Sequence, residues 1–352
     1  MKKRKFFVLM ICIMLLAGIT LAGCGGGTTT TTTAPDDEDT LPVFNLRMAG
    51  QNPVDFSDSI LMAEAVKEIS ERTNGGVNIE FYPANQLGDY IVVYEEVMQG
   101  TIDMACITAT SHVDQRVNMI YIPYLITNFD EAKKVWTEGS YFFAQFNKVQ
   151  NDAGVKLLGL HPGGLMGIGA AKPINVATAF DFSVPKNDIL LRLPPLEILQ
   201  ITADTMQFRT TSIPYADLFP ALQTGIVDGW IGGGPELNYT GFRDAIKYYY
   251  DYKYIDDTFG MFMNLKLFNS MPAEYQAVIT DVFKAKSIEA IDAQQAKDDQ
   301  FLKDLAAYGI EVIIPTQAQR NEMAAYMREH GWPKLEDMFG ADVMAALIDD
   351  VL

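Results

Sequence analysis

The sequence predicts an α/β fold in two lobes, with mixed, mostly parallel sheets. Apolar runs of strand length alternate with helical stretches over most of the chain, a pattern typical of βα units. The length of 352 residues suggests two domains. From Pro272 to about Tyr308 no further Gly or Pro occurs, which predicts a helix of roughly 50 Å, longer than a small domain is wide. We therefore expect this helix to span both lobes.

The first half of the body reads as strands that alternate with helices. Strands are expected over residues 43–48, 77–82, 102–108 and 155–160, and helices over residues 57–72, 89–99 and 128–147. Ser57 or Asp58 is a suitable N-cap for the first helix, and Gly100 follows the second, where glycine commonly ends helices. This order predicts a largely parallel sheet.

The second half continues the alternation and then becomes helical. Strands are expected over residues 168–171, 188–192, 226–230, 246–254, 258–264 and 310–314, with a short helix over residues 195–202. After the long helix, Thr316 and Gln319 have the spacing of a capping box, which predicts a helix to His330. Two short helices are expected to close the chain.

The chain is organised around residues 214–235, PYADLFPALQTGIVDGWIGGGP, which are expected to form a helix followed by a strand. Pro214 is favoured as the first residue of a helix, and Gly225 is expected to end it. Leu218, Phe219, Leu222 and Ile226 are spaced to share one apolar face. The following strand ends in Trp230 and three glycines, at the kind of strand end where ligands bind in open α/β sheets. The alternative is that Trp230 only fills a core.

The N-terminal segment has the pattern of an export signal. Residues 1–23 contain the basic run MKKRK and an apolar stretch too short for a stable membrane span. They lead into Cys24 through LAG, which resembles the box that precedes the acylated cysteine of bacterial lipoproteins; an ordinary cleavage site beside a chance cysteine is the alternative. Residues 24–42 are then expected to be the lipidated cysteine and a disordered linker, so that the body is tethered to a membrane surface.

The composition excludes several classes of function. A net charge of −18 is unsuited to binding nucleic acid, because basic side chains supply most of that affinity. Once Cys12 and Cys24 are assigned to the leader and the anchor, Cys106 stands alone, so neither a disulfide nor a cysteine-containing metal site is predicted. Motifs for phosphate, dinucleotide cofactors, serine hydrolases and zinc proteases are missing. We expect a binding protein without a cofactor, not an enzyme.

Arg192 is the strongest candidate for binding an acid group. It follows the apolar run ILL at the end of a predicted strand, where an unpaired charge is costly to bury. Its planar guanidinium can donate two parallel hydrogen bonds to a ligand carboxylate. The alternative is an internal ion pair with an aspartate or glutamate.

Polar groups near other strand and helix ends are further candidates. They are Gln51, Asn52, Thr108, Ser111, His161, Glu236 and, at the start of a helix, Gly88. Hydroxyl, amide and backbone N–H groups in such places can bind a ligand, and a helix N-terminus favours an anion. For each of them an ordinary cap, turn or solvated-loop role is the alternative.

Six segments resemble, in order, those of the solute-binding proteins of TRAP transporters, the tripartite ATP-independent periplasmic carriers of organic acids. They are YPANQLGD (82–89), GTIDMA (100–105), YIPYL (121–125), AKPI (171–174), LLRLP (190–194) and ALQTGIVDG (221–229). The resemblance covers nearly all of residues 43 to about 285. It implies a periplasmic-binding-protein-like fold with hinge strands, whose lobes close on a small carboxylate solute.

The resemblance also implies roles and partners. Arg192 matches the family's carboxylate-binding arginine, although Leu190 stands where a lysine is usual. Leu165 stands roughly where a second arginine is often found, which puts a ligand held at both ends by arginines in doubt. Membrane subunits of the transporter are the expected partners. The implied units are residues 43–162 for lobe 1, residues 163–250 for lobe 2, and residues 251–352 for returning hinge strands, the spanning helix and C-terminal helices.

Two other classes of function remain open on the sequence. One is an ABC-type or sensor-associated solute-binding lipoprotein of the same shape. The other is an extracytoplasmic hydrolase, although the sequence offers no recognisable pair of nucleophile and base.

Overall fold

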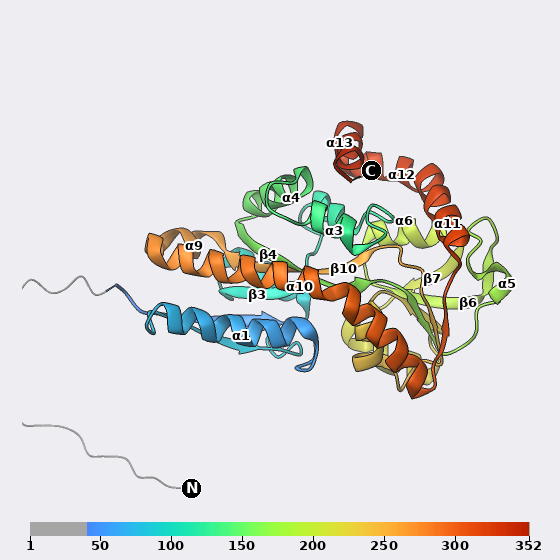
Figure 1. Ribbon diagram of the computed structural model, residues 1–352, viewed down its shortest axis with the longest axis horizontal. Coiled ribbons are helices and arrows are strands. Elements are labelled where there is room, and N and C mark those ends of the chain that lie inside the picture. The colour runs from blue at the N-terminus through green and yellow to red at the C-terminus, as the bar shows by residue number, and fades with distance from the viewer. Residues whose placement is uncertain (1–40, 352) are drawn as a thin grey trace, which may run out of the picture. The chain divides into compact units, whose positions relative to one another are not determined.

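The computed structural model describes residues 41–351, with side chains placed to residue 349. The predicted leader, Cys24 and the linker up to residue 40 lie outside the described residues. Two sheets form the centre of the described part (Figure 1). The first has five strands and the second has six.

The first sheet has the strand order β2-β1-β3-β10-β4. Its strands are β1 (Phe44–Gly50), β2 (Val77–Tyr82), β3 (Met104–Thr108), β4 (Val155–Leu165) and β10 (Asp256–Asn264). β1 runs parallel to both β2 and β3, whereas β10 runs antiparallel to β3 and β4. Every residue of β10 is buried, because this late strand is inserted between two strands from the first half of the chain.

The second sheet has the order β11-β9-β5-β8-β6-β7. Its strands are β5 (Ile168–Ala170), β6 (Lys186–Leu193), β7 (Phe208–Ser212), β8 (Gly229–Ile231), β9 (Tyr248–Tyr250) and β11 (Glu311–Ile313). The sheet is mixed, since β6 is parallel to β7 and β8 while β5 is antiparallel to β8 and β9. The sequence analysis missed β7, because this edge strand, FRTTS, has a polar and partly exposed sequence.

The long helix is present as α10 (Ala273–Tyr308), with Gly309 in the left-handed conformation after it. It packs on β4 and on α1 (Ser57–Arg72) beside the first sheet. Farther along, it packs on β11 of the second sheet and on α8 (Pro235–Leu237). Figure 1 shows it crossing from the side of α9 (Leu265–Ser270) toward the second sheet. The prediction of one helix that spans both parts is therefore confirmed.

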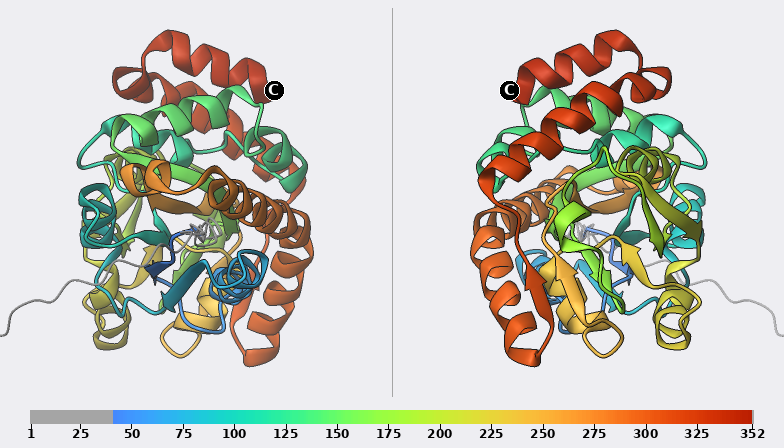
Figure 2. Two further views of the ribbon diagram at one scale, coloured as in Figure 1. Left: turned by 90° about the vertical axis from the view of Figure 1, so that its left-hand side faces the viewer. Right: turned by 90° about the vertical axis from the view of Figure 1, so that its right-hand side faces the viewer.

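The remaining helices cover the sheets and one end of the molecule. They are α2 (Tyr90–Gln99), α3 (Phe129–Val135), α4 (Tyr141–Asp152), α5 (Val176–Ala179), α6 (Glu197–Thr205), α7 (Leu218–Thr224), α11 (Gln317–His330), α12 (Trp332–Phe339) and α13 (Ala341–Val351). The C-terminal helices lie over α3 and α4 (Figure 2). The capping box of Thr316 and Gln319 is formed as predicted.

Some local predictions were wrong. Ser57 and Asp58 are not the N-cap of α1 but lie inside the helix, and Phe56 occupies the N-cap position. The single helix expected over residues 128–147 is broken into α3 and α4, because Gly139 has a φ of 108° and Ser140 caps a new helix by accepting from the backbone N–H of Phe143. Pro214 precedes a short 3-10 turn and is not the first residue of α7. Ile226 is 63% exposed, because the chain leaves the helix at Gly225 before reaching it.

Candidate ligand-binding site

A cavity lies where strand and helix ends of the two sheets meet. Gln51, Thr108 and Asp257 reach it from β1, β3 and β10 of the first sheet. Arg192 and Trp230 reach it from β6 and β8 of the second sheet. The site thus draws on both sheets, as expected for ligands bound beyond strand ends.

Arg192 has a free hydrogen-bond donor in this cavity. It is 2% exposed, and its Nε donates to the carbonyl oxygen of Ile213 at 2.7 Å. Its Nη2 is buried without a hydrogen-bond partner, and within residues 41–351 no carboxylate forms an ion pair with it. Burial lowers the pKa of Arg192 to about 10, and Tyr90, Tyr215, Asp89 and Asp257 oppose that shift. The guanidinium remains charged at neutral pH and can bind an external carboxylate.

Trp230 packs in the core and also forms part of the cavity wall. It is 2% exposed. Its Nε1 donates to Oδ1 of Asn238 at 3.0 Å, and its ring centroid lies 4.6 Å from that of Phe242. The backbone of Gly233 approaches the indole so closely that a Cβ would lie 2.6 Å from it. These contacts hold the ring as a fixed wall of the cavity.

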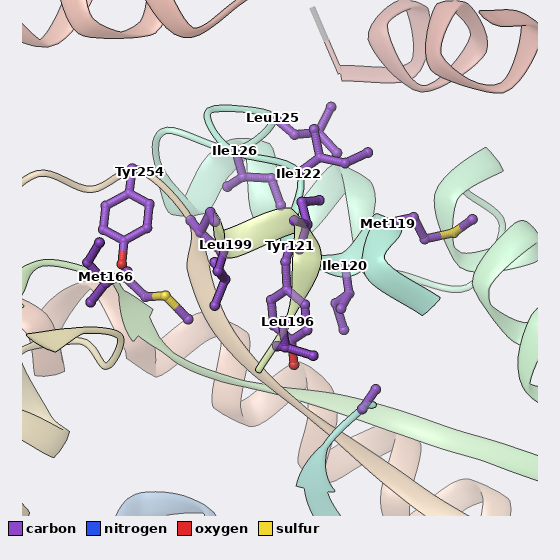
Figure 3. Close-up of a cluster of buried hydrophobic side chains, with 14 of the residues drawn as sticks. Met119, Ile120, Tyr121, Ile122, Leu125, Ile126, Met166, Leu196, Leu199 and Tyr254 are labelled. Atoms are coloured by element: carbon purple, nitrogen blue, oxygen red, sulfur yellow. The ribbon is translucent and has the colours of Figure 1, made fainter. Parts of the chain in front are cut away.

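Gln51 and Thr108 form a polar clamp between the ends of β1 and β3. Gln51 Nε2 donates to Thr108 Oγ1 at 3.0 Å, and Gln51 Oε1 accepts from the Thr108 backbone N–H at 2.6 Å. The amide of Gln51 is therefore oriented by the protein itself. Another part of the cavity lining is apolar. It consists of Tyr121, Met166, Leu196 and Leu199, which belong to one buried cluster (Figure 3).

Five of the predicted site residues are absent from the cavity lining. Ser111 and Gly88 are partly exposed, and no hydrogen bond of the Ser111 side chain is seen within the described residues. Asn52 is fully buried and donates to Asp58 Oδ2 at 2.9 Å. Its side chain is thus used inside the protein and does not line the cavity. For these residues the geometry favours the structural alternatives.

His161 and Glu236 are also buried away from the cavity lining. Both ring nitrogens of His161 are without a partner within the described residues, and burial lowers its pKa to about 3, helped by the charge of Lys297. Glu236 is 2% exposed, so the solvated-loop alternative is excluded. Its carboxylate accepts from the backbone N–H and the Oγ of Ser57, both at 2.8 Å.

The sequence analysis missed several residues of the cavity. Tyr90, Tyr121, Tyr215 and Asp257 all line it. A signal for Asp257 was present, since Asp256 and Asp257 precede a strand that is otherwise almost entirely apolar. The tyrosines gave no such signal, because the sequence does not distinguish a core tyrosine from one that lines a cavity.

A larger hollow lies elsewhere, between α3, α4, β4 and α10. Its cationic Lys284 is about half exposed and pairs with Glu138 at 2.5 Å. The hollow is mainly apolar and offers no buried free cation, so it fits an organic acid less well than the Arg192 cavity does.

Metal sites and membrane-spanning helices were also considered possible in residues 41–351. No cluster of three or more His, Cys, Asp or Glu side chains suited to a metal ion occurs there. Within the same range, none of the helices combines the length and apolar character needed to cross a bilayer.

Comparisons with known proteins agree with this arrangement. The ectoine-binding periplasmic protein TeaA of Halomonas elongata is 22% identical over 294 residues, which are 79% of this chain and 80% of that protein. A TRAP periplasmic solute-binding protein of Haemophilus influenzae RdAW with bound L-gulonate has a TM-score of 0.78 and 23% identity, over 87% of this chain and 99% of that one. The sugar acid-binding protein DctPAm of Advenella mimigardefordensis, in complex with galactonate, has a TM-score of 0.79 and 16% identity, over 88% of this chain and 98% of that one.

The family is shown by a match over most of the body. Residues 59–333 match the model of the DctP family, described as bacterial extracellular solute-binding protein, family 7. The matched range includes the second sheet, every strand of the first sheet except β1, the helix α10, and all residues that line the Arg192 cavity except Gln51. The two-sheet α/β fold and the order of motifs are those expected of this family. The chain therefore belongs to the DctP family, the bacterial extracellular solute-binding proteins of family 7.

Proposed function

We propose that this protein captures a small organic acid on the outer side of the cytoplasmic membrane and delivers it to TRAP membrane subunits. The observation that carries the proposal is Arg192, a buried guanidinium with an unpartnered Nη2 in a cavity between two sheets. A ligand carboxylate supplies the missing acceptor, and the planar fork favours it over a single-point acceptor.

The cavity also limits the ligand. Trp230 and the apolar cluster around Tyr121 favour a compact solute with a planar or apolar body. Leu165, near the place of a second arginine in relatives, is 1% exposed and apolar, which speaks against a dicarboxylate held by two arginines. The relatives named above bind ectoine, L-gulonate and galactonate, so the family scaffold accepts different solutes.

Delivery requires a change of shape that depends on the ligand. We assign lobe 1 to residues 43–162 and lobe 2 to residues 163–250, with hinges where the chain passes from β4 to β5 and from β9 to β10. A ligand bridging the two sheets stabilises the closed form only by binding it better than the open form. Acylated Cys24 would keep the receptor at the membrane surface, near its partner subunits.

The test is the binding of acids by an Arg192→Lys variant. Lysine keeps the charge but loses the fork, so we expect the dissociation constant of the tightest acid in a calorimetric screen to rise at least about tenfold. The screen contains mono- and dicarboxylic acids, keto acids, amino acids and sugar acids. Arg209→Lys is the matched control, because Arg209 is exposed on the adjacent strand β7 and outside the cavity. Wild-type affinity in Arg192→Lys would refute the assignment of the carboxylate.

A further inference from the structure

The cavity contains one cation and one carboxylate that do not pair with each other. Asp257 enters from β10 of the first sheet and Arg192 enters from β6 of the second. Within residues 41–351 neither side chain takes part in an ion pair. The two are nevertheless close enough for each charge to influence the other's pKa. A small molecule placed between them can contact both.

Asp257 differs from its neighbour Asp256 in having no internal partner. Asp256 is 3% exposed, accepts from Thr258 Oγ1 at 2.9 Å, and is not part of the cavity lining. Asp257 is 7% exposed, lines the cavity, and accepts no hydrogen bond at its carboxylate from the part of the chain that the structure describes. Because a buried carboxylate without a donor is costly, an external donor would relieve that cost.

Charge balance favours a ligand that carries its own cation. Asp257 is the sole acidic side chain among the described residues that line the cavity, and Arg192 is the sole basic one. The anion of an organic acid that has no cationic group would neutralise Arg192 and leave the charge of Asp257 uncompensated. A zwitterion would neutralise both groups, and the aromatic walls, including Trp230, are also suited to a cation.

We propose that Asp257 is the second anchor of the ligand and that the preferred solute is a compact zwitterion, with a carboxylate for Arg192 and an N–H-bearing cation for Asp257. This inference rests on the proposed function. Burial raises the pKa of Asp257 to about 7, with repulsion from Asp58 adding to the shift and Arg192 opposing it. A bound cation would lower that pKa again and hold Asp257 ionised.

The test uses probes that differ in one group. L-proline carries a carboxylate and an ammonium, L-pyroglutamate carries a carboxylate and a neutral N–H, and cyclopentanecarboxylate carries a carboxylate alone. L-valine and isovalerate form a second pair without a ring. Binding to the whole protein is measured by calorimetry at pH 8, where Asp257 is mostly ionised.

We expect an amino acid of this set to bind at least about tenfold more tightly than its partner without nitrogen. Asp257→Asn should remove that difference by weakening the amino acid, without weakening the plain acid. Asp256→Asn is the control, since Asp256 lies outside the cavity lining and already accepts a hydrogen bond from Thr258 within the protein. Equal melting temperatures of the variants and the wild type would show that the fold is retained.

Failure of this inference is distinguishable from failure of the proposed function. Equal affinity for proline, pyroglutamate and cyclopentanecarboxylate, or unchanged amino-acid binding in Asp257→Asn, would overturn the role of Asp257. So would absence of binding by all five probes at millimolar concentration. In each case, binding of any other acid that is lost in Arg192→Lys would leave the proposed function standing.

Discussion

Asp58 is a buried carboxyl group whose ionisation opposes folding. It is 1% exposed, and its carboxylate accepts from Asn52 Nδ2 at 2.9 Å and from Ser59 Oγ at 3.2 Å. Burial nevertheless raises its pKa to about 7, and these hydrogen bonds only reduce the shift. At pH 8 the folded protein therefore holds a carboxylate that would be better solvated in the unfolded chain.

Replacing Asp58 by Asn should stabilise the protein in a pH-dependent way. The amide has nearly the same shape, and Asn52 can turn its own amide so that its unpaired Oδ1 accepts from the new Nδ2. We expect a gain on the order of 2–4 kcal/mol in the free energy of unfolding at pH 8, and a much smaller gain at pH 5. Urea unfolding at the two pH values measures it. Asp181→Asn is the contrasting control, since hydrogen bonds from Ser183 lower the pKa of that exposed carboxyl. A gain that is the same at both pH values would contradict this account.

At the scale of elements, helix α1 is capped from a distant part of the chain. Phe56 occupies its N-cap position and offers no side-chain hydrogen bond. Glu236 of α8 supplies the acceptor through its contacts with Ser57, and a carboxylate at a helix N-terminus is also favoured by the helix dipole. The contact links a helix that packs on β2 of the first sheet to one that directly follows β8 of the second.

Removing this cap should weaken both the fold and ligand binding. Glu236→Ala leaves the Ser57 N–H buried without an acceptor, which costs about 1–3 kcal/mol of unfolding free energy, whereas Glu236→Gln keeps one acceptor and should cost less. Because the contact joins the two sheets, we also expect weaker binding of an acid that does not touch Glu236. Urea titration and calorimetry measure the two effects. Glu274→Ala, in the exposed first turn of α10, is the control. Stability in Glu236→Ala equal to that of the control would show that the cap is dispensable.

For the whole molecule, the buried titratable groups determine how stability depends on pH. Burial raises the pKa of Asp58, Asp257 and Asp298 to about 7. The folded state therefore binds more protons than the unfolded state between the ordinary carboxyl pKa and about 7, and stability rises as pH falls through 7. His161, with its pKa lowered to about 3, acts in the opposite direction below its ordinary value of 6.5.

We therefore expect the melting temperature to rise when the pH is lowered from 8 to 6.5, because the three aspartates take up protons over this range. His161 begins to oppose the rise only near pH 6.5, where it is half protonated in the unfolded chain and neutral in the folded protein. The high negative charge of the chain, −18 at pH 7, works in the same direction as the aspartates. The rise should end near pH 4, because Arg116 lowers the pKa of surface carboxylates such as Asp114, which therefore bind protons in the unfolded chain before they do so in the folded protein. Calorimetric scans in matched buffers measure the profile. A melting temperature that falls steadily from pH 8 to pH 6 would refute this explanation.

The sequence by itself determined the parts of this protein that depend on local pattern. Alternating apolar runs predicted both α/β units, the stretch without Gly or Pro predicted α10, and the spacing of Thr316 and Gln319 predicted a helix start. Arg192 could be identified because a charge at the end of an apolar strand requires a partner. Each of these features depends on residues that are near one another in the chain, so its physical cause can be read from the sequence.

Only the tertiary structure decided which buried groups meet. Asp257 lies in the cavity with Arg192, although 65 positions separate their residue numbers, and Glu236 caps a helix that begins at Ser57. Periodicity says which face of an element is buried, but it does not say which group on a distant element lies opposite. For the same reason His161 and Asn52, both plausible at strand ends, proved to be buried and absent from the cavity lining. The pairing of distant strands, with β10 inserted between β3 and β4, produced the site.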